Sequence, residues 1–191
     1  MHRKEFTQEI TAEVRGLEMP HAVFVVEIQE REEINSFGKD NIFYSFSANK
    51  NIEPRQLSKI ASGGEISRIM LCLKSVLAKR RNMPAMILDE VDSGVSGSIA
   101  DKMGDLIAEL SKKMQIFAIT HLPQIASKGN THLLVFKEID DKNTTKTKIR
   151  EITGGERVLE LARMLSGSET GEAAIANARE LLGRNLMNNH I

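Results

Sequence analysis

The sequence has a single cysteine, no excess of charge of either sign and no long apolar run. Cys72 alone rules out an internal disulfide, and no apolar core of signal-peptide length stands near the N-terminus, so we expect a reducing, cytoplasmic compartment. Lys and Arg together number 26, as do Asp and Glu, so any contact with nucleic acid must come from a local patch. Because no run approaches the roughly 18 apolar residues that cross a bilayer, we expect no membrane partner.

What the sequence does contain is the pattern of an α/β domain, with 41% hydrophobic residues among 191, enough to bury a core. Two short apolar runs, at 85–88 and 115–120, are typical of strands covered on both faces. The amphipathic segment between them completes a βαβ unit with parallel strands. The other expected elements are antiparallel strands at 22–28 and 42–47, a loop at 48–61, a helix at about 63–80, strands near 131–137 and 146–152, and helices near 156–165 and 171–186.

The N-terminal segment, residues 2–17, is charged and carries one narrow apolar stripe at helical spacing, made by Phe6, Ile10, Val14 and Leu17. Such a stripe is typical of the end of a coiled coil, and equally of a short surface helix packed on a core. Roughly two heptads are too few to decide between the two.

In the stretch Ser62-Gly63-Gly64-Glu65, hereafter the SGGE segment, two glycines stand where a helix is expected to begin. A capping box, in which Ser and Glu satisfy the first amides reciprocally, explains Ser62 and Glu65. It does not explain the glycines, each of which costs about 1 kcal/mol relative to Ala inside a helix, though less in the first turn. Bare backbone at a helix N-terminus lets an anion approach free amides, so the segment favours a phosphate-binding helix start over a simple cap.

Two adjacent acids, Asp89 and Glu90, end the first of the two apolar runs, at the strand edge where open α/β sheets bind ligands. Asp89 suits a hydrated Mg²⁺, and Glu90 suits the orientation or deprotonation of a water. The alternative is that both acids cap the following turn. A right-handed crossover would place His121, after the neighbouring strand, on the same edge, and three converging polar groups favour a site.

These motifs, taken in order, resemble a known family. The SGGE segment, the strand into Asp89-Glu90, and Thr120-His121 resemble the signature, Walker B and switch-histidine motifs of ABC-type ATPases. The longer phrases KIASGGEISRIMLCLKS, ILDEVDSGVSG, ITHLPQIA and ELARMLSG resemble, more narrowly, the C-terminal part of the RecN family of bacterial, SMC-like ATPases of DNA double-strand-break repair. The four phrases stand in the family's order and spacing from about residue 20 onward.

The fold that the resemblance implies is the C-terminal lobe of an ABC-type or SMC-type P-loop NTPase head. Such a lobe has a parallel sheet core with flanking helices and a small antiparallel β element. Residues 19–191 would form this lobe, and residues 1–18 would be the end of a coiled-coil helix. A nucleoid-associated location in the bacterial cytoplasm and DNA as a partner follow from the same resemblance.

A phosphate loop of the form G-x-x-x-x-G-K-[ST], which such an ATPase needs, is missing. The only Gly-Lys pair is Gly38-Lys39, with Glu33 in place of the first glycine and Asp40 in place of Ser or Thr. In RecN-like and SMC-like proteins this Walker A motif lies in an N-terminal half, beyond a long coiled coil. The resemblance therefore implies that the N-terminal half of the head is a partner, and that this chain alone hydrolyses little or no ATP.

The site that the resemblance implies is a composite one for ATP and Mg²⁺. Asp89 would bind Mg²⁺ through water, Glu90 would be the general base, and His121 would contact the γ-phosphate as a sensor. Ser62, Gly63, Gly64 and Glu65 would instead meet the ATP held by a second head, so that ATP joins two heads in a homodimer.

The turn after Glu90 corresponds to the D-loop of the family, which contacts the second head. Asp92 and Ser93 are the candidates there for a contact with the cofactor across the dimer. Ser96 stands where many ABC proteins have Asp, which leaves its contribution open.

Two basic segments have competing interpretations. Lys79-Arg80-Arg81 is expected at a helix C-terminus, where cations complement the helix dipole. Lys146, Lys148 and Arg150 alternate along a predicted strand and would share one face, either as a DNA contact or as the charged guard of an edge strand.

Two other classes of function compete with the ATPase head. The chain could be a non-enzymatic α/β module whose glycine-rich helix start binds another anion or a partner's acidic residue. It could also be a metal-dependent hydrolase built on Asp89, Glu90 and His121, but no H-x-H or HExxH spacing supplies further ligands.

Overall fold

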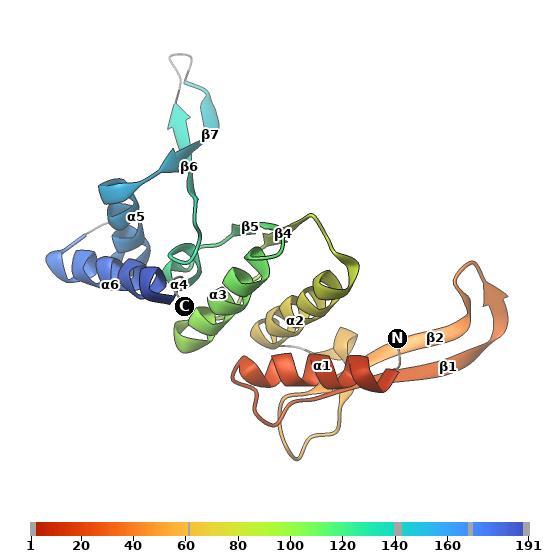
Figure 1. Cartoon of the computed structure of the whole chain (residues 1–191). Coiled ribbons are helices and arrows are strands. Elements are labelled where there is room, and N and C mark those ends of the chain that lie inside the picture. The colour runs from red at the N-terminus through yellow and green to blue at the C-terminus, as the bar shows by residue number, and fades with distance from the viewer. Residues whose placement is uncertain (1–2, 61, 140–142, 168–169, 189–191) are drawn as a thin grey trace. The chain divides into compact units, whose positions relative to one another are not determined.

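Helix α1 (Arg3–Gly16) packs on the hairpin formed by strands β1 (Val23–Asn35) and β2 (Gly38–Ser47) in the computed structural model (Figure 1). The predicted apolar stripe faces this hairpin and the following helix, with Ile10 and Val14 fully buried. Phe6 meets Phe24 edge to face, with ring centroids 6.2 Å apart. The stripe is therefore buried within the chain. That residues 1–18 belong to a coiled coil stays a prediction.

The structure describes residues 3–60, 62–139, 143–167 and 170–188, with the backbone alone for 184–188. The chain falls into two units, residues 1–119 and 120–191. Within the described ranges no helix combines the length and the apolar character needed to cross a membrane.

The antiparallel strand pair predicted at 22–28 and 42–47 is confirmed, with Val23 opposite Ser47 and Ile28 opposite Ile42. Both strands run further than predicted, to a tight connection at residues 36–37. The charged residues 30–33 give no hydrophobic pattern, so the extension could not be predicted: an exposed hairpin needs only its ladder of backbone hydrogen bonds. Inside the predicted loop, a two-residue strand β3 (Arg55–Gln56) pairs with β2, and a 3-10 turn (Leu57–Lys59) follows.

Helix α2 (Gly63–Arg81) begins and ends close to its predicted bounds and is tied to α1 by polar contacts. The carboxylate of Glu13 accepts from Ser75 Oγ at 3.1 Å and from Lys79 Nζ at 2.5 Å. Arg80 binds both carboxylate oxygens of Glu9, at 2.6 and 3.2 Å. The basic segment at the end of α2 therefore has a structural role, with two of its cations paired to acids of α1.

The face that α2 buries includes Cys72, as expected for a structural thiol. Burial, and then the negative charge of Glu13, raise the pKa of Cys72 to about 12. The spacing of the apolar residues predicts one shared face made of Ile66, Ile69, Met70, Leu73, Val76 and Leu77. This is wrong for Met70 and Leu77, which are exposed. The buried residues of α2 centre on Cys72 and Ser75, with Leu71 and Ala78 on one side and Ile69 and Val76 on the other, so Met70 and Leu77 lie on the opposite side of the helix.

The predicted βαβ unit is confirmed as strand β4 (Ala85–Asp89), helix α3 (Gly97–Ser111) and strand β5 (Gln115–Ile119), with the strands parallel and Asp89 opposite Ile119. The prediction that both faces of the strands are covered is wrong for this chain. Met86 and Leu88 are buried, but Ile87 is 67% exposed and Ile119 is 56% exposed. Among the described residues, the face of this two-stranded sheet that carries Ile87 and Ile119 is exposed, although parallel sheets are normally buried on both faces.

The second unit contains the helix α4 (Pro123–Ala126), the antiparallel strands β6 (His132–Ile139) and β7 (Thr145–Ile152), and the helices α5 (Gly154–Ser166) and α6 (Glu172–Asn188). Leu161 and Ala162 of α5 form a small core with Ala178 of α6. The two strands and two long helices confirm the predicted order. Helix α4 was not predicted, because a single turn is too short to show a hydrophobic period.

Candidate functional site

The SGGE segment forms the start of α2, as predicted. Ser62 is the N-cap residue, and its Oγ accepts a hydrogen bond from Glu65 N at 3.4 Å. Ile66 N donates to Ser62 O, the first bond of the helix ladder, so the amides of Gly63 and Gly64 precede the ladder and have no acceptor within the helix. Ser62 and Gly63 are exposed, whereas Gly64 is buried.

Gly64 is a glycine because another backbone segment touches it. A Cβ added at Gly64 would lie 2.3 Å from Gly94 O, and one added at Gly94 would lie 2.8 Å from Gly64 N. Gly94 also has a positive φ of 70°, which favours glycine. Close backbone packing, rather than access for an anion, therefore accounts for Gly64.

Gly63 has no such reason within the chain. A Cβ added there would meet nothing within 4 Å, and its φ is not in the left-handed region. Its bare, exposed amide matches the predicted anion-binding helix start. The two glycines of the SGGE segment thus have different explanations.

The turn after β4 carries the predicted acids. Asp89 and Glu90 are both exposed, at the carboxyl end of the strand. Glu90 has a φ of 49°, a strained conformation for a non-glycine residue and one that is enriched at functional sites. Ser93 N donates to Glu90 O and Val95 N to Asp92 O, each at 3.2 Å, which fixes the turn.

The turn and the SGGE helix are joined by a second contact besides that between the two glycines. Ser67 Oγ donates to Ser93 O at 3.1 Å. Asp92 is only 1% exposed, and this burial favours a structural role over a contact with a second head. Ser93 is exposed, and Ser96 is the exposed N-cap residue of α3.

Arg68 was not singled out from the sequence, and it links the SGGE helix to the end of α1. Its Nε donates to Gly64 O and its Nη1 to Leu17 O, both at 3.0 Å. Glu18, the next residue, pairs with Lys102 of α3 at 3.2 Å. The contacts of Arg68 with Leu17 and of Glu18 with Lys102 join residues far apart in the sequence, so no local pattern could have revealed them.

His121 follows β5 by two residues and belongs to the second unit. The parallel register places the ends of β4 and β5 at one edge, as predicted. The backbone around His121 is held by Leu122 N, which donates to Thr120 Oγ1 at 3.0 Å. The convergence of the His121 side chain with Asp89 and Glu90 stays a prediction.

A metal ion at this edge would have one carboxylate ligand from β4. Within the described residues no three His, Cys, Asp or Glu side chains gather closely enough to enclose an ion. This fits Mg²⁺, which keeps several waters and binds through one or two carboxylates and phosphate oxygens.

The basic residues of β7 share one face, as their alternation predicted, but acids neutralise part of it. Lys148 pairs with Glu138 across the hairpin, and Arg150 binds both oxygens of Glu156 at 2.9 Å. These pairs favour a charge-guarded strand over a DNA contact.

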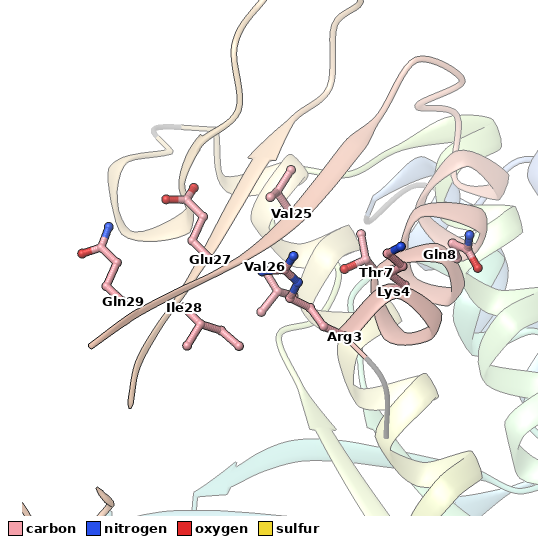
Figure 2. A pocket seen from close by; sticks show the side chains of 9 residues that line it. All are labelled: Arg3, Lys4, Thr7, Gln8, Val25, Val26, Glu27, Ile28 and Gln29. Carbon is pink, nitrogen blue, oxygen red and sulfur yellow. The ribbon is translucent and has the colours of Figure 1, made fainter. Parts of the chain in front are cut away.

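A groove of about 560 Å³ lies between α1 and β1 (Figure 2). It is lined by Arg3, Lys4, Thr7 and Gln8 of the helix and by residues 25–29 of the strand. None of the predicted site residues lines this groove.

No protein-family model matches the sequence. The "DNA repair protein RecN" of Rickettsia bellii is 41% identical over 179 residues, which are 94% of this chain and 32% of that protein. The "DNA repair protein RecN" of Haemophilus influenzae is 40% identical over 176 residues, 92% of this chain and 31% of that protein. The chain thus spans about a third of the length of these curated relatives, and it matches their C-terminal portion.

Solved structures of SMC heads share the fold. The SMC head domain of Pyrococcus yayanosii, with a coiled coil and joint, superposes with a TM-score of 0.60 at 14% identity, covering 95% of this chain and 29% of that one. A chain from a study of ATP-driven dimerisation and DNA-stimulated activation of SMC ATPases gives a TM-score of 0.57 at 15% identity, covering 86% of this chain and 96% of that one.

Proposed function

The chain belongs to the RecN family of DNA repair proteins, and on this premise we propose that it is the C-terminal lobe of an ATPase head that acts in DNA double-strand-break repair. The observation that carries the proposal is the start of α2. Gly63 is exposed and no neighbour requires a glycine there, while Gly64 is fixed against the turn that follows Asp89 and Glu90. The exposed glycine and the two acids are thus carried by two segments in direct contact.

The acids and His121 would act on the nucleotide of their own head. When bound, ATP supplies the γ-phosphoryl group and Mg²⁺ neutralises the charge that develops on it. Asp89 would hold the hydrated ion, and the exposed carboxylate of Glu90 would accept the proton of the attacking water. His121 would donate a hydrogen bond to the γ-phosphate.

The SGGE segment would serve the other nucleotide of the dimer. The exposed amide of Gly63, with the positive end of the α2 dipole, is suited to a terminal phosphate that approaches from outside. ATP would therefore join two heads, and hydrolysis would release them. Dimerisation driven by ATP is described for an SMC ATPase of the same fold.

The N-terminal half of the head would be the first partner. Ile87, Phe117 and Ile119 form an exposed apolar face on a two-stranded parallel sheet, which the chain itself leaves uncovered. The relatives are about three times longer than this chain, and a Walker A segment is required for ATP hydrolysis. We propose that this half supplies the cover and the phosphate loop, and that the assembled protein acts on DNA at the bacterial nucleoid.

ATP turnover by the complete head, meaning this chain together with the segment that carries the phosphate loop, tests the proposal. Glu90→Gln should abolish turnover and prolong the ATP-bound dimer, since the variant keeps the shape of the side chain and loses the base. Glu109→Gln is the matched control, because Glu109 is an exposed acid of α3 paired with Lys112. This chain alone should show no turnover.

Two results would contradict the proposal. Turnover by this chain alone that Glu90→Gln abolishes would mean that the phosphate-binding elements are misassigned. Calorimetry in which the complete head binds inorganic phosphate but not ATP would favour the non-enzymatic anion-binding module.

A further inference from the structure

One arginine of α5 holds the carboxyl end of α4, the short helix that begins two residues after His121. Arg157 Nη2 lies 3.4 Å from Ala126 O, 2.9 Å from Ser127 O and 2.5 Å from Gly129 O. The last carbonyls of a helix have no donor within the helix, so a cation there satisfies them and complements the dipole. A single guanidinium therefore closes the helix and the turn that follows it.

Arg157 is itself well anchored. Its neighbours on α5, Leu161 and Ala162, form the core of the second unit, and Ala126 of α4 packs against that core. The guanidinium is half-buried, and burial lowers the pKa of Arg157. Within the part of the chain that the structure describes, the hydrogen bonds of its Nη2 all go to main-chain carbonyls, so the side chain holds the backbone.

The hold on α4 reaches His121 through a short chain of hydrogen bonds. Ile125 N and Ala126 N donate to Leu122 O at 3.1 and 3.0 Å, and Leu122 N donates to Thr120 Oγ1 at 3.0 Å. These bonds enclose the backbone of His121 between Thr120 and Leu122. One turn of helix is not stable by itself, so its geometry depends on tertiary contacts at its ends.

We propose that Arg157 is a positioning residue for His121: by holding α4, it fixes the backbone from which the histidine reaches the γ-phosphate of ATP. The inference rests on the proposed function of His121, and it adds that Arg157 helps to orient this histidine. A misplacement of about 1 Å can reduce the rate of a positioned reaction by about a hundredfold, so a clamp one helical turn away has a measurable effect.

The test compares Arg157→Ala, His121→Ala and the double variant in the complete head. His121→Ala should lower kcat for ATP hydrolysis. Arg157→Ala should lower kcat by about tenfold, within the range expected for mispositioning, with less than about a twofold change in KM for ATP. The double variant should be no slower than His121→Ala, because a positioning residue has nothing left to position.

A readout without nucleotide accompanies the kinetics. Hydrogen exchange of the amides in residues 122–129 should be faster in Arg157→Ala and unchanged in Arg163→Ala. Arg163 is the matched control on the same helix, since its side chain is 62% exposed and its pairing with Glu160 at 3.7 Å is long. Arg157→Lys should restore part of the kcat, because an ammonium group can donate to the same carbonyls. If Arg157→Ala does not fold, Arg157→Lys replaces it in the comparison with His121→Ala and the double variant.

The outcomes separate the two proposals. Unchanged kcat in His121→Ala would overturn the role proposed for the histidine. A slow His121→Ala with a normal Arg157→Ala would overturn the positioning role alone. If kcat of the double variant fell by the product of the two single effects, Arg157 would act independently of His121. This result would also overturn the positioning role of Arg157.

Discussion

Replacement of Gly64 by alanine tests the contact between the SGGE helix and the turn after β4. The added Cβ would lie 2.3 Å from Gly94 O, about 1 Å short of the 3.4 Å at which ordinary contact begins. Because the obstacle is backbone, the helix or the turn has to move, and overpacking of this kind costs about 1–3 kcal/mol. Alanine recovers up to about 1 kcal/mol of helix propensity, so we expect a net loss of about 1–2 kcal/mol.

Urea unfolding followed by circular dichroism measures this loss. With a dependence of about 2 kcal/mol per molar urea, the midpoint for Gly64→Ala should fall by roughly 0.5–1 M. Gly63→Ala is the matched control, because an added Cβ meets nothing within 4 Å, and its midpoint should not fall. It should nevertheless weaken ATP-dependent dimerisation of complete heads. Equal midpoints for both variants and the parent chain would refute the packing explanation of Gly64.

Three further predictions concern residues that are not part of the SGGE segment itself. The Cys72 thiol, with its pKa raised to about 12 by burial, should resist a thiol reagent at about pH 8 until the chain unfolds. Burial, and then the charge of Arg157, lower the pKa of His132 in the folded chain. The unfolded chain therefore binds a proton at His132 more tightly than the folded chain does. The free energy of unfolding should consequently fall as pH drops below about 6.5. His132→Gln should reduce the difference between urea midpoints at about pH 7.5 and about pH 5.5. Arg68→Ala should cost about 1–2 kcal/mol and speed hydrogen exchange at the end of α1, because Leu17 O loses its donor, whereas Arg68→Lys should lose less.

The explanation of the glycines shows where sequence reasoning reached its limit. The cost of glycine in a first turn correctly marked the start of α2 as unusual, and Ser62 as its cap. The reason for Gly64 could not be read from the sequence, because its neighbour Gly94 is thirty positions away and acts through its backbone. A contact with a backbone carbonyl oxygen does not depend on the type of side chain at that position. A glycine needed for close packing therefore cannot be distinguished in the sequence from a glycine needed for access of a ligand.

The candidate site was predicted to a similar depth. Asp89 and Glu90 were expected at the end of a strand, and they lie there. The strained backbone of Glu90, the burial of Asp92 and the clamp by Arg157 were not expected. Each of these depends on a turn or on a contact between distant elements, for which hydrophobic periodicity carries no information.

By itself, the sequence determined the order and type of the long helices and main strands, the parallel pairing of β4 with β5, and the family, because periodicity, caps and short motifs are local properties of the chain. Only the tertiary structure decided which faces are covered. An apolar run such as residues 85–88 indicates that the strand is stable in an apolar environment. It does not indicate whether the covering apolar surface belongs to the same chain or to another. The exposure of Ile87 and Phe117 shows that this chain provides it on one face alone.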